Sequence, residues 1–273
     1  MKQWKEVTLK REDQCNFHCR IIGEGKPLLL IHGAACDSEF FIDTAPAFAQ
    51  RYQVIIYDRS GYGKSLRQVD PPACGSEEYF FRQGDDAAWV LQQLVPGQKA
   101  VVIGCSCGAA VAAYMAAGHP ECIEQVFLHE PPIYSLIPEL TDCWDLIDGI
   151  NEAIAQKKYN RALNRFLLFL ASSAAPSKKP MTEAEMDNFT NNGLLFVKQE
   201  FQLAFDKEFG VPPIETNVAL LWGEDGEGLP LVQCAHKAAE VLGCPIHKIP
   251  GGHNAAREDP EIFAQAVFSI LDA

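Results

Sequence analysis

The stretch VVIGCSCGAAVAA places three side chains with nucleophilic chemistry next to one another, Cys105, Ser106 and Cys107. A β-branched apolar run precedes them and a run of small residues follows. With Gly104 and Gly108 they form the pattern Gly-x-Ser-x-Gly, in which a strand turns sharply into a helix and the central side chain is lifted away from the sheet. The pattern predicts that Ser106 is the nucleophile and that the flanking cysteines pack around the turn.

A serine hydroxyl is a weak nucleophile at its ordinary pKa and needs a neighbouring base. The seven histidines are the candidates: His18, His32, His119, His129, His236, His247 and His253. His253 is favoured because it lies in PGGHN, between the last apolar run and the last helical stretch, where a loop reaches back over the carboxyl end of a sheet. His119, His236 and His247 are interpreted as ordinary surface or core residues, and His129 as a packed strand residue.

Four motifs, taken in order, resemble those of the alpha/beta-hydrolase family over essentially the whole chain. LLLIHGAA is similar to its oxyanion segment, YDRSGYGKS to its D-x-x-G-x-G-x-S turn, GCSCG to its nucleophile elbow and PGGHN to its histidine loop. The resemblance implies that the backbone N–H groups of Ala34 and Cys107 form an oxyanion hole. Such donors are directed at the negative charge that appears only in a tetrahedral intermediate.

The acid that orients the histidine is less directly indicated. In this family the order is serine, acid, histidine, and the usual acid lies in a G-x-x-D turn after the strand that VALLW predicts. Gly226 stands at that position here, flanked by Asp225 and Glu227. Some family members carry the acid after the preceding strand, where this chain has Glu130 directly after QVFLH. Glu130 is therefore the favoured acid, with Asp225 and then Glu227 as alternatives.

The segment GYGKS ends like a phosphate-binding Walker A loop. That motif, G-x4-G-K-[ST], needs glycine at position 58, where this chain has Asp58. The phosphate-binding interpretation is excluded on that residue.

Short continuous apolar runs are typical of strands covered on both faces in a parallel sheet, and this chain has five: PLLLIH, QVIIY, AVVIG, QVFLH and VALLW. WKEVTL and FHCRII predict an antiparallel hairpin before them. PIHKI predicts a last strand, although its apolar pattern is weaker than that of the five runs. Helices are predicted over 76–94, 107–118, 230–242 and 259–271. The alternation predicts an α/β fold with a doubly wound, mostly parallel eight-stranded sheet.

Residues 131–216 interrupt this alternation. NRALNRFLLFLASSA and LLFVKQEFQLAF look helical, and the polar segment APSKKPMTEAE separates them. We predict a helical cap over 131–216, inserted between strands 6 and 7, and a core domain formed by 1–130 and 217–273. Apolar cap side chains at helical spacing, such as Leu194 and Val197, either line a pocket or pack against the core.

Composition narrows the range of partners. A formal net charge of −13 and a pI near 5.0 disfavour nucleic acid, which is bound by clustered Lys and Arg. No signal-peptide pattern and no membrane-length apolar run is seen, so a cytoplasmic protein without a membrane partner is expected. The ten cysteines are scattered, which favours reduced thiols over disulfides or a structural zinc site. The oligomeric state is left open.

Together these features predict a serine hydrolase that cleaves a small, apolar ester, lactone or related acyl bond through an acyl-enzyme intermediate. Its partner is a small-molecule substrate, and no metal or organic cofactor is implied. Serine at the elbow argues against the dehalogenases and epoxide hydrolases of similar fold, which use an aspartate. A carbon–carbon bond hydrolase is one alternative. A low-turnover binding or signalling protein is another, suggested by the missing G-x-x-D acid.

Overall fold

The computed structural model describes residues 3–12, 15–67, 70 and 72–273, so a few residues of the predicted core domain lie outside it. The described residues form one eight-stranded sheet with strand order β1-β2-β4-β3-β5-β6-β7-β8. β1 and β2 are an antiparallel hairpin, β2 is antiparallel to β4, and the remaining pairs are parallel. The strands are β1 (Lys5–Lys10), β2 (Asn16–Ile22), β3 (Pro27–Ile31), β4 (Gln53–Tyr57), β5 (Ala100–Cys105), β6 (Ile123–His129), β7 (Val218–Gly223) and β8 (Ile246–Ile249). This confirms the predicted fold class.

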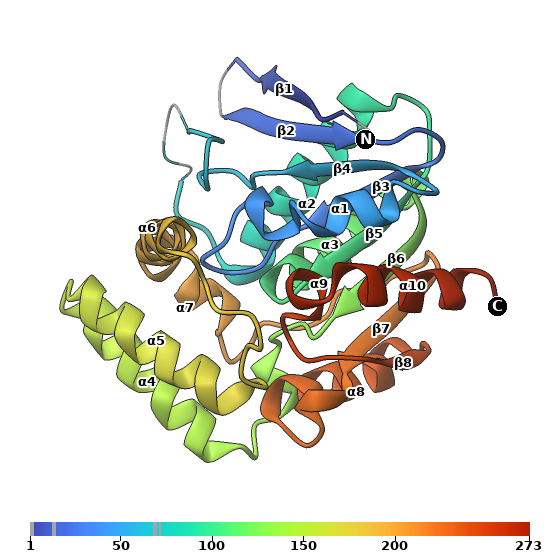
Figure 1. Ribbon diagram of the computed structural model, residues 1–273. Coiled ribbons are helices and arrows are strands. Elements are labelled where there is room, and N and C mark those ends of the chain that lie inside the picture. Colours follow the sequence, from blue (N-terminus) through green and yellow to red (C-terminus); the bar gives the residue numbers. More distant parts are fainter. Residues whose placement is uncertain (1–2, 13–14, 68–69, 71) are drawn as a thin grey trace.

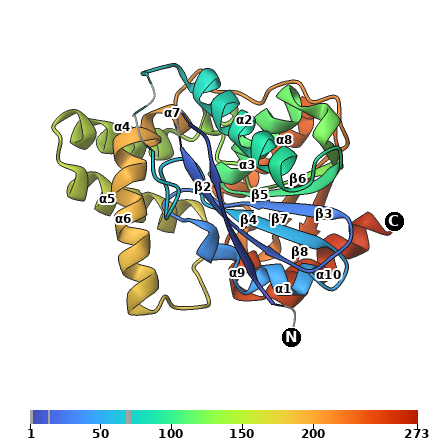
Figure 2. The ribbon, with the colours of Figure 1, turned by 90° about the horizontal axis from the view of Figure 1, so that it is seen from above.

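Helices cover both faces of the sheet, which explains why its central strands are apolar without alternation. Every residue of β3 and β5 is buried. Figure 2 shows α2 (Ser76–Leu94), α3 (Cys107–Gly118) and α8 (Pro230–Leu242) on one face, with α1 (Thr44–Phe48), α9 (Ala255–Glu258) and α10 (Pro260–Leu271) on the other. The four helices predicted for the core agree with α2, α3, α8 and α10. α10 begins one residue later than predicted because Asp259 is its N-cap.

Four helices lie between β6 and β7, at one end of the sheet (Figure 1). They are α4 (Thr141–Ala155), α5 (Tyr159–Ser173), α6 (Glu183–Gln199) and α7 (Phe201–Ala204). α4 was not predicted from the sequence, although five of its apolar side chains recur at helical spacing and are all buried: Cys143, Trp144, Ile147, Ile150 and Ile154. We call residues 131–216 the cap segment, and their division from the core stays a prediction.

The start of α6 corrects the interpretation of APSKKPMTEAE as a polar separator. The helix begins at Glu183, inside that stretch. The Thr182 side chain accepts a hydrogen bond from Glu185 N, and the Glu185 carboxylate accepts one from Thr182 N. This reciprocal arrangement is a capping box, so the last polar residues of the stretch initiate a helix.

The apolar side chains of the cap segment pack into the same cluster as α2 and α3. Val197, Phe201 and Phe205 are buried in this cluster, and Leu194 packs against it. These side chains therefore pack in or against the core cluster, and Val197 also lines a second cavity that is described below. In the described part of the chain, no helix combines the length and apolar character needed to cross a membrane.

Candidate active site

Ser106 lies between the last residue of β5 and the first residue of α3. Its backbone has φ +56° and ψ −130°, a conformation that non-glycine residues rarely adopt. Ser106 N donates to His129 O at 2.9 Å, which ties the turn to the end of β6. Such strain persists only where the surroundings enforce it, and it is concentrated at functional positions.

The two glycines of the elbow allow the strand and the helix to approach closely. A Cβ atom on Gly104 would lie 2.2 Å from Gly108 O, and one on Gly108 would lie 2.2 Å from Ile31 O. Both distances are far below van der Waals contact. The Gly-x-Ser-x-Gly spacing is therefore required by backbone packing around Ser106.

Glu130 and His253 are joined by a hydrogen bond. Glu130 follows β6 with φ +46°, and its Oε2 lies 2.7 Å from His253 Nδ1. Its other oxygen, Oε1, accepts from Gly223 N at 2.9 Å. Burial alone would raise the pKa of Glu130, but its bond to His253, the neighbouring imidazoles and the Gly223 amide lower that pKa to about 2. An ionised carboxylate can only accept here, so Nδ1 carries the imidazole proton and Nε2 is available as a base.

In the described part of the chain, neither alternative acid is hydrogen-bonded to His253. Asp225 Oδ2 is paired with Lys178 Nζ, and Glu227 is exposed. A Cβ atom placed on Gly226 would lie 3.8 Å from Glu130 Oε1. The vacant position after β7 and the carboxylate that follows β6 are therefore close neighbours.

Ser106 and His253 line the same cavity, which has a volume of about 340 Å³. In the described structure they are not hydrogen-bonded to each other. Most of the wall is apolar and comes from α5, α6 and the segment between them. Its lining includes Phe166, Leu167, Leu170, Ala171, Ala174, Ala175, Met181, Met186 and Phe189, with Phe40 and Cys36 from the core. These cap side chains were not singled out from the sequence, nor were Asn254 and Arg257, which also line the cavity.

The cap segment is tied to the core on two sides of this cavity. On one side Arg257 Nη2 donates to Glu185 Oε1 at 2.9 Å. On the other, Asn188 and Asn192 each donate to Asp37 Oδ2, at 2.7 and 3.1 Å. α6 is held in place by both.

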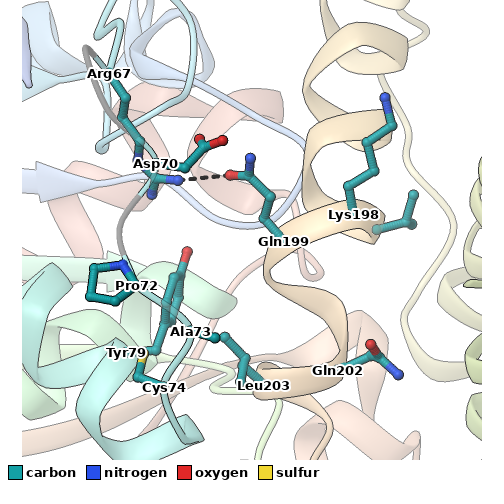
Figure 3. Close-up of a pocket in the computed structure, with 11 residues that line it drawn as sticks. Arg67, Asp70, Pro72, Ala73, Cys74, Tyr79, Lys198, Gln199, Gln202 and Leu203 are labelled. Atoms are coloured by element: carbon teal, nitrogen blue, oxygen red, sulfur yellow. Dashed lines mark hydrogen bonds between the residues drawn. The ribbon is translucent and has the colours of Figure 1, made fainter.

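A second cavity, of about 370 Å³, lies between the segment after β4 and the junction of α6 and α7 (Figure 3). Arg67 Nη1 donates to Gln199 Oε1 across it at 2.7 Å. Its described lining contains neither Ser106 nor His253. The second cavity is slightly larger, but the first cavity is the one that contains Ser106 and His253, the candidate catalytic residues.

The flanking cysteines are buried, with exposed fractions of 2% for Cys105 and 1% for Cys107. Burial raises the pKa of both thiols far above the ordinary value, so neither forms a thiolate at neutral pH. Cys105 also contributes to the cavity wall, although the sequence pattern predicted only packing around the turn for it.

The two expected oxyanion donors lie on adjacent elements. Ala34 lines the cavity just after β3. Cys107 is the first residue of α3, where backbone N–H groups have no acceptor within the helix. Burial raises the pKa of the Cys107 thiol and a hydrogen bond from the Ala34 backbone opposes this rise, so the two residues lie close together.

The turn 57–65 is held in place by hydrogen bonds of Asp58, some of which reach a residue outside the turn. Asp58 Oδ1 accepts from Ser38 N at 2.9 Å and from Ser38 Oγ at 2.5 Å, while Asp58 Oδ2 accepts from Lys64 N at 2.8 Å. The aspartate that excludes a Walker A loop therefore ties the short helical turn that begins at Ser38 to the turn 57–65.

His129 is fully buried, and its ring centroid lies 6.1 Å from that of His253. Burial lowers the pKa of His129 to about 4. His129 is therefore neutral at physiological pH. It packs next to His253, in agreement with its prediction as a packed strand residue.

The chain is similar to known hydrolases in both sequence and fold. The family model for the alpha/beta hydrolase fold matches residues 26–259. The chain is 26% identical over 267 residues to the uncharacterized hydrolase YraK of Bacillus subtilis strain 168, covering 94% of this chain and 93% of that protein. Among solved structures, carboxylesterase CesB of Bacillus subtilis matches with TM-score 0.68 and 18% identity over 98% of this chain and 92% of that one. The epoxide hydrolase CorEH matches with TM-score 0.71 and 18% identity over 99% of each chain. These two structures share the fold.

Proposed function

Because this chain belongs to the alpha/beta-hydrolase family, we propose that it is a serine hydrolase that cleaves small apolar esters or related acyl bonds. The observation that carries the proposal is the 2.7 Å contact between Glu130 and His253, beside the cavity that His253 shares with Ser106. A strained serine, an oriented imidazole and a buried ionised carboxylate are the three groups that acyl transfer needs.

In the proposed reaction His253 Nε2 takes the proton of Ser106 Oγ as this oxygen attacks the acyl carbon. The Glu130 carboxylate stabilises the imidazolium that forms. The substrate carbonyl oxygen becomes negatively charged and accepts from the N–H groups of Ala34 and Cys107. Collapse of the tetrahedral intermediate breaks the bond to the leaving group, which receives the proton from His253. Water, deprotonated by His253, then hydrolyses the acyl-serine ester and restores the hydroxyl.

The cavity supports an apolar acyl group. Its volume of about 340 Å³ lies near the lower end of the ~300–1,000 Å³ typical of small-molecule sites. Arg257, the cationic residue in its lining, is already bonded to Lys179 O, Pro180 O and Glu185 Oε1. With this charge occupied by the protein itself, a neutral apolar chain is the better match to the wall.

The nucleophile favours ester cleavage over the activity named for CorEH. Attack of Ser106 on an epoxide carbon would give an ether, which has no carbonyl for water to attack. Attack on an acyl carbon gives an ester, which His253 and water can hydrolyse. The low-turnover alternative was suggested by the missing acid after β7, and the contact of Glu130 with His253 weighs against it.

A fluorophosphonate probe tests the proposal. We expect labelling of the wild-type protein, loss of labelling in Ser106→Ala, and retention in the matched variant Cys105→Ala. A panel of p-nitrophenyl esters of increasing acyl length then measures chain preference. Absence of labelling in the wild type, or persistence of labelling in Ser106→Ala, would contradict the proposal.

A further inference from the structure

Arg59 and Glu200 form an ion pair that is sealed from solvent, with an exposed fraction of 0% for both side chains. Arg59 Nη2 lies 3.1 Å from Glu200 Oε1 and Arg59 Nη1 lies 3.2 Å from Glu200 Oε2. The hydroxyls of Tyr62 and Tyr79 also donate to Glu200 Oε2, at 2.6 and 2.9 Å. Ser106, His253 and Glu130 do not use this pair, although burial of two charges is costly unless each charge has partners.

The same guanidinium contacts the oxyanion segment. Arg59 Nη2 donates to Gly33 O at 3.3 Å. A second donor reaches this carbonyl from His32, whose Nδ1 lies 3.0 Å from Gly33 O. His32 Nε2 accepts from Arg59 N at 2.9 Å, so the ring proton must be on Nδ1. Burial and the charge of Arg59 lower the pKa of His32 well below its ordinary value, which keeps this ring neutral.

The carbonyl of Gly33 and the N–H group of Ala34 are opposite ends of one planar peptide unit. Donors bound to the carbonyl fix the plane of this unit and polarise it, which makes the N–H a stronger donor. In the proposed reaction that N–H group binds the oxyanion. The orientation and strength of this donor therefore depend on the two side chains that hold Gly33 O.

Glu200 lies between α6 and α7 in the cap segment, whereas Arg59 follows β4 in the core. Figure 3 shows the cavity beside this junction, which Tyr79, Gln199 and Leu203 help to line. The Glu200 carboxylate occupies two N–H groups of Arg59 and so sets the direction of the donor that reaches Gly33 O.

We propose that Glu200, acting through Arg59, positions the Gly33–Ala34 peptide unit for oxyanion binding. The inference rests on the proposed serine hydrolase function and makes both side chains positioning residues of that reaction. The cap segment thereby controls a step of the chemistry in addition to forming the cavity wall. A pair that only anchored the cap would affect stability and ligand binding in general. A positioning pair affects stabilisation of the transition state selectively.

The test uses two matched ketone inhibitors and the full-length protein. A trifluoromethyl ketone adds Ser106 and forms a tetrahedral oxyanion, whereas the corresponding methyl ketone of the same chain length binds mainly as a ground-state ligand. Glu200→Gln removes the charge but keeps the shape. Arg59→Lys keeps the charge, but a single ammonium group cannot contact Glu200 and Gly33 O in the same way.

We expect both variants to lose about 10- to 100-fold in kcat with little change in KM, somewhat less than the ~10²–10³-fold measured when an oxyanion donor is removed outright. The inhibition constant of the trifluoromethyl ketone should rise by the same factor, and that of the methyl ketone should stay unchanged. Arg11→Lys is the control, because Arg11 forms a part-buried ion pair with Asp86, at 2.7 Å, away from the cavity. This control should change none of these constants.

Unchanged kcat in folded variants, or equal weakening of both ketones, would overturn the inference and leave the pair as an anchor. If the variants do not fold, a structure of the wild-type adduct decides. The inference requires the adduct oxygen within hydrogen-bond distance of Ala34 N and Arg59 still bonded to Gly33 O, and any other donor set overturns it. Failure of the proposed function looks different, because the wild-type protein itself would then show no Ser106-dependent turnover, and the inference would be overturned with it.

Discussion

Glu130 Oε2 and His253 Nδ1 lie 2.7 Å apart, although 123 positions separate the two residues in the chain. The contact joins the turn after β6 to the loop after β8. It holds the imidazole in one tautomer with its other nitrogen available as a base.

Replacing Glu130 by Gln should lower kcat for a p-nitrophenyl ester by roughly 10²- to 10⁴-fold, by analogy with the loss of a triad acid. The amide keeps the size of the side chain but cannot stabilise the imidazolium. Asp225→Asn is the matched control, since Asp225 pairs with Lys178, and it should retain nearly all activity. Wild-type turnover in Glu130→Gln together with an inactive Asp225→Asn would reverse the assignment.

A carboxylate moved to position 226 should restore part of the activity lost at position 130. Glu130→Gly suits the positive φ of that residue, and Gly226→Asp starts from a Cβ position 3.8 Å from the native Glu130 Oε1. The double variant should regain ~10-fold or more over Glu130→Gly alone, a fraction of the ~10⁴-fold that a triad acid can contribute. Glu130→Gly combined with Glu227→Asp is the comparison, and equal recovery in both would argue against a specific contact with His253.

Protonation of Glu130 at acid pH should lower the free energy of unfolding of the protein. Its pKa is near 4.5 in an ordinary environment and about 2 in the fold. A lower pKa in the folded state means that the carboxylate stabilises the fold above pH 4.5, and that this stabilisation is lost as the pH falls from 4.5 through 2. The difference corresponds to about 3 kcal/mol of unfolding free energy.

Urea unfolding of the wild-type protein and Glu130→Gln between pH 6 and pH 2.5 measures this contribution. The variant should be less stable at pH 6 and should lose less stability over the acid range. Parallel curves for the two proteins would show that Glu130 does not titrate as described.

Filling the cavity should shorten the preferred acyl chain. Ala171 lines the cavity from α5, so Ala171→Trp removes space from the apolar wall. We expect kcat/KM for long-chain esters to fall by about 10-fold or more relative to acetate esters, in line with the ~1–3 kcal/mol that one methylene group is worth in such a pocket. Leu168→Trp, on the same helix at a position that is 67% exposed, should leave the chain-length profile unchanged. The same profile in both variants would place the acyl group elsewhere.

The sheet was predictable because its strands are buried on both faces, which leaves continuous apolar runs in the sequence. The elbow was predictable for a local reason, since Gly104 and Gly108 are required by contacts within a few residues and with β3. The preference for Glu130 over Asp225 was predicted only by resemblance to family members that carry the acid after this strand. Both follow adjacent strands, and the decision depends on where each side chain points after its turn.

The parts of the site that depend on distant contacts were also beyond sequence patterns. Arg59 and Glu200 are 141 positions apart, and no periodicity connects them. The capping box at Thr182 and the helical spacing within α4 are both visible in the sequence, and they could have predicted these two helices. The cap side chains that line the cavity could not be predicted, because helical spacing identifies the apolar face of a helix but not the element that this face contacts.

The attachment of α6 to Arg257 on one side and to Asp37 on the other makes the roof of the cavity a fixed wall. Because α6 is already ordered by these contacts, a ligand that enters does not have to order this helix, and that part of the entropic cost of binding is avoided. If the proposed reaction is correct, the shape of this wall would then select among acyl chains before Ser106 reacts.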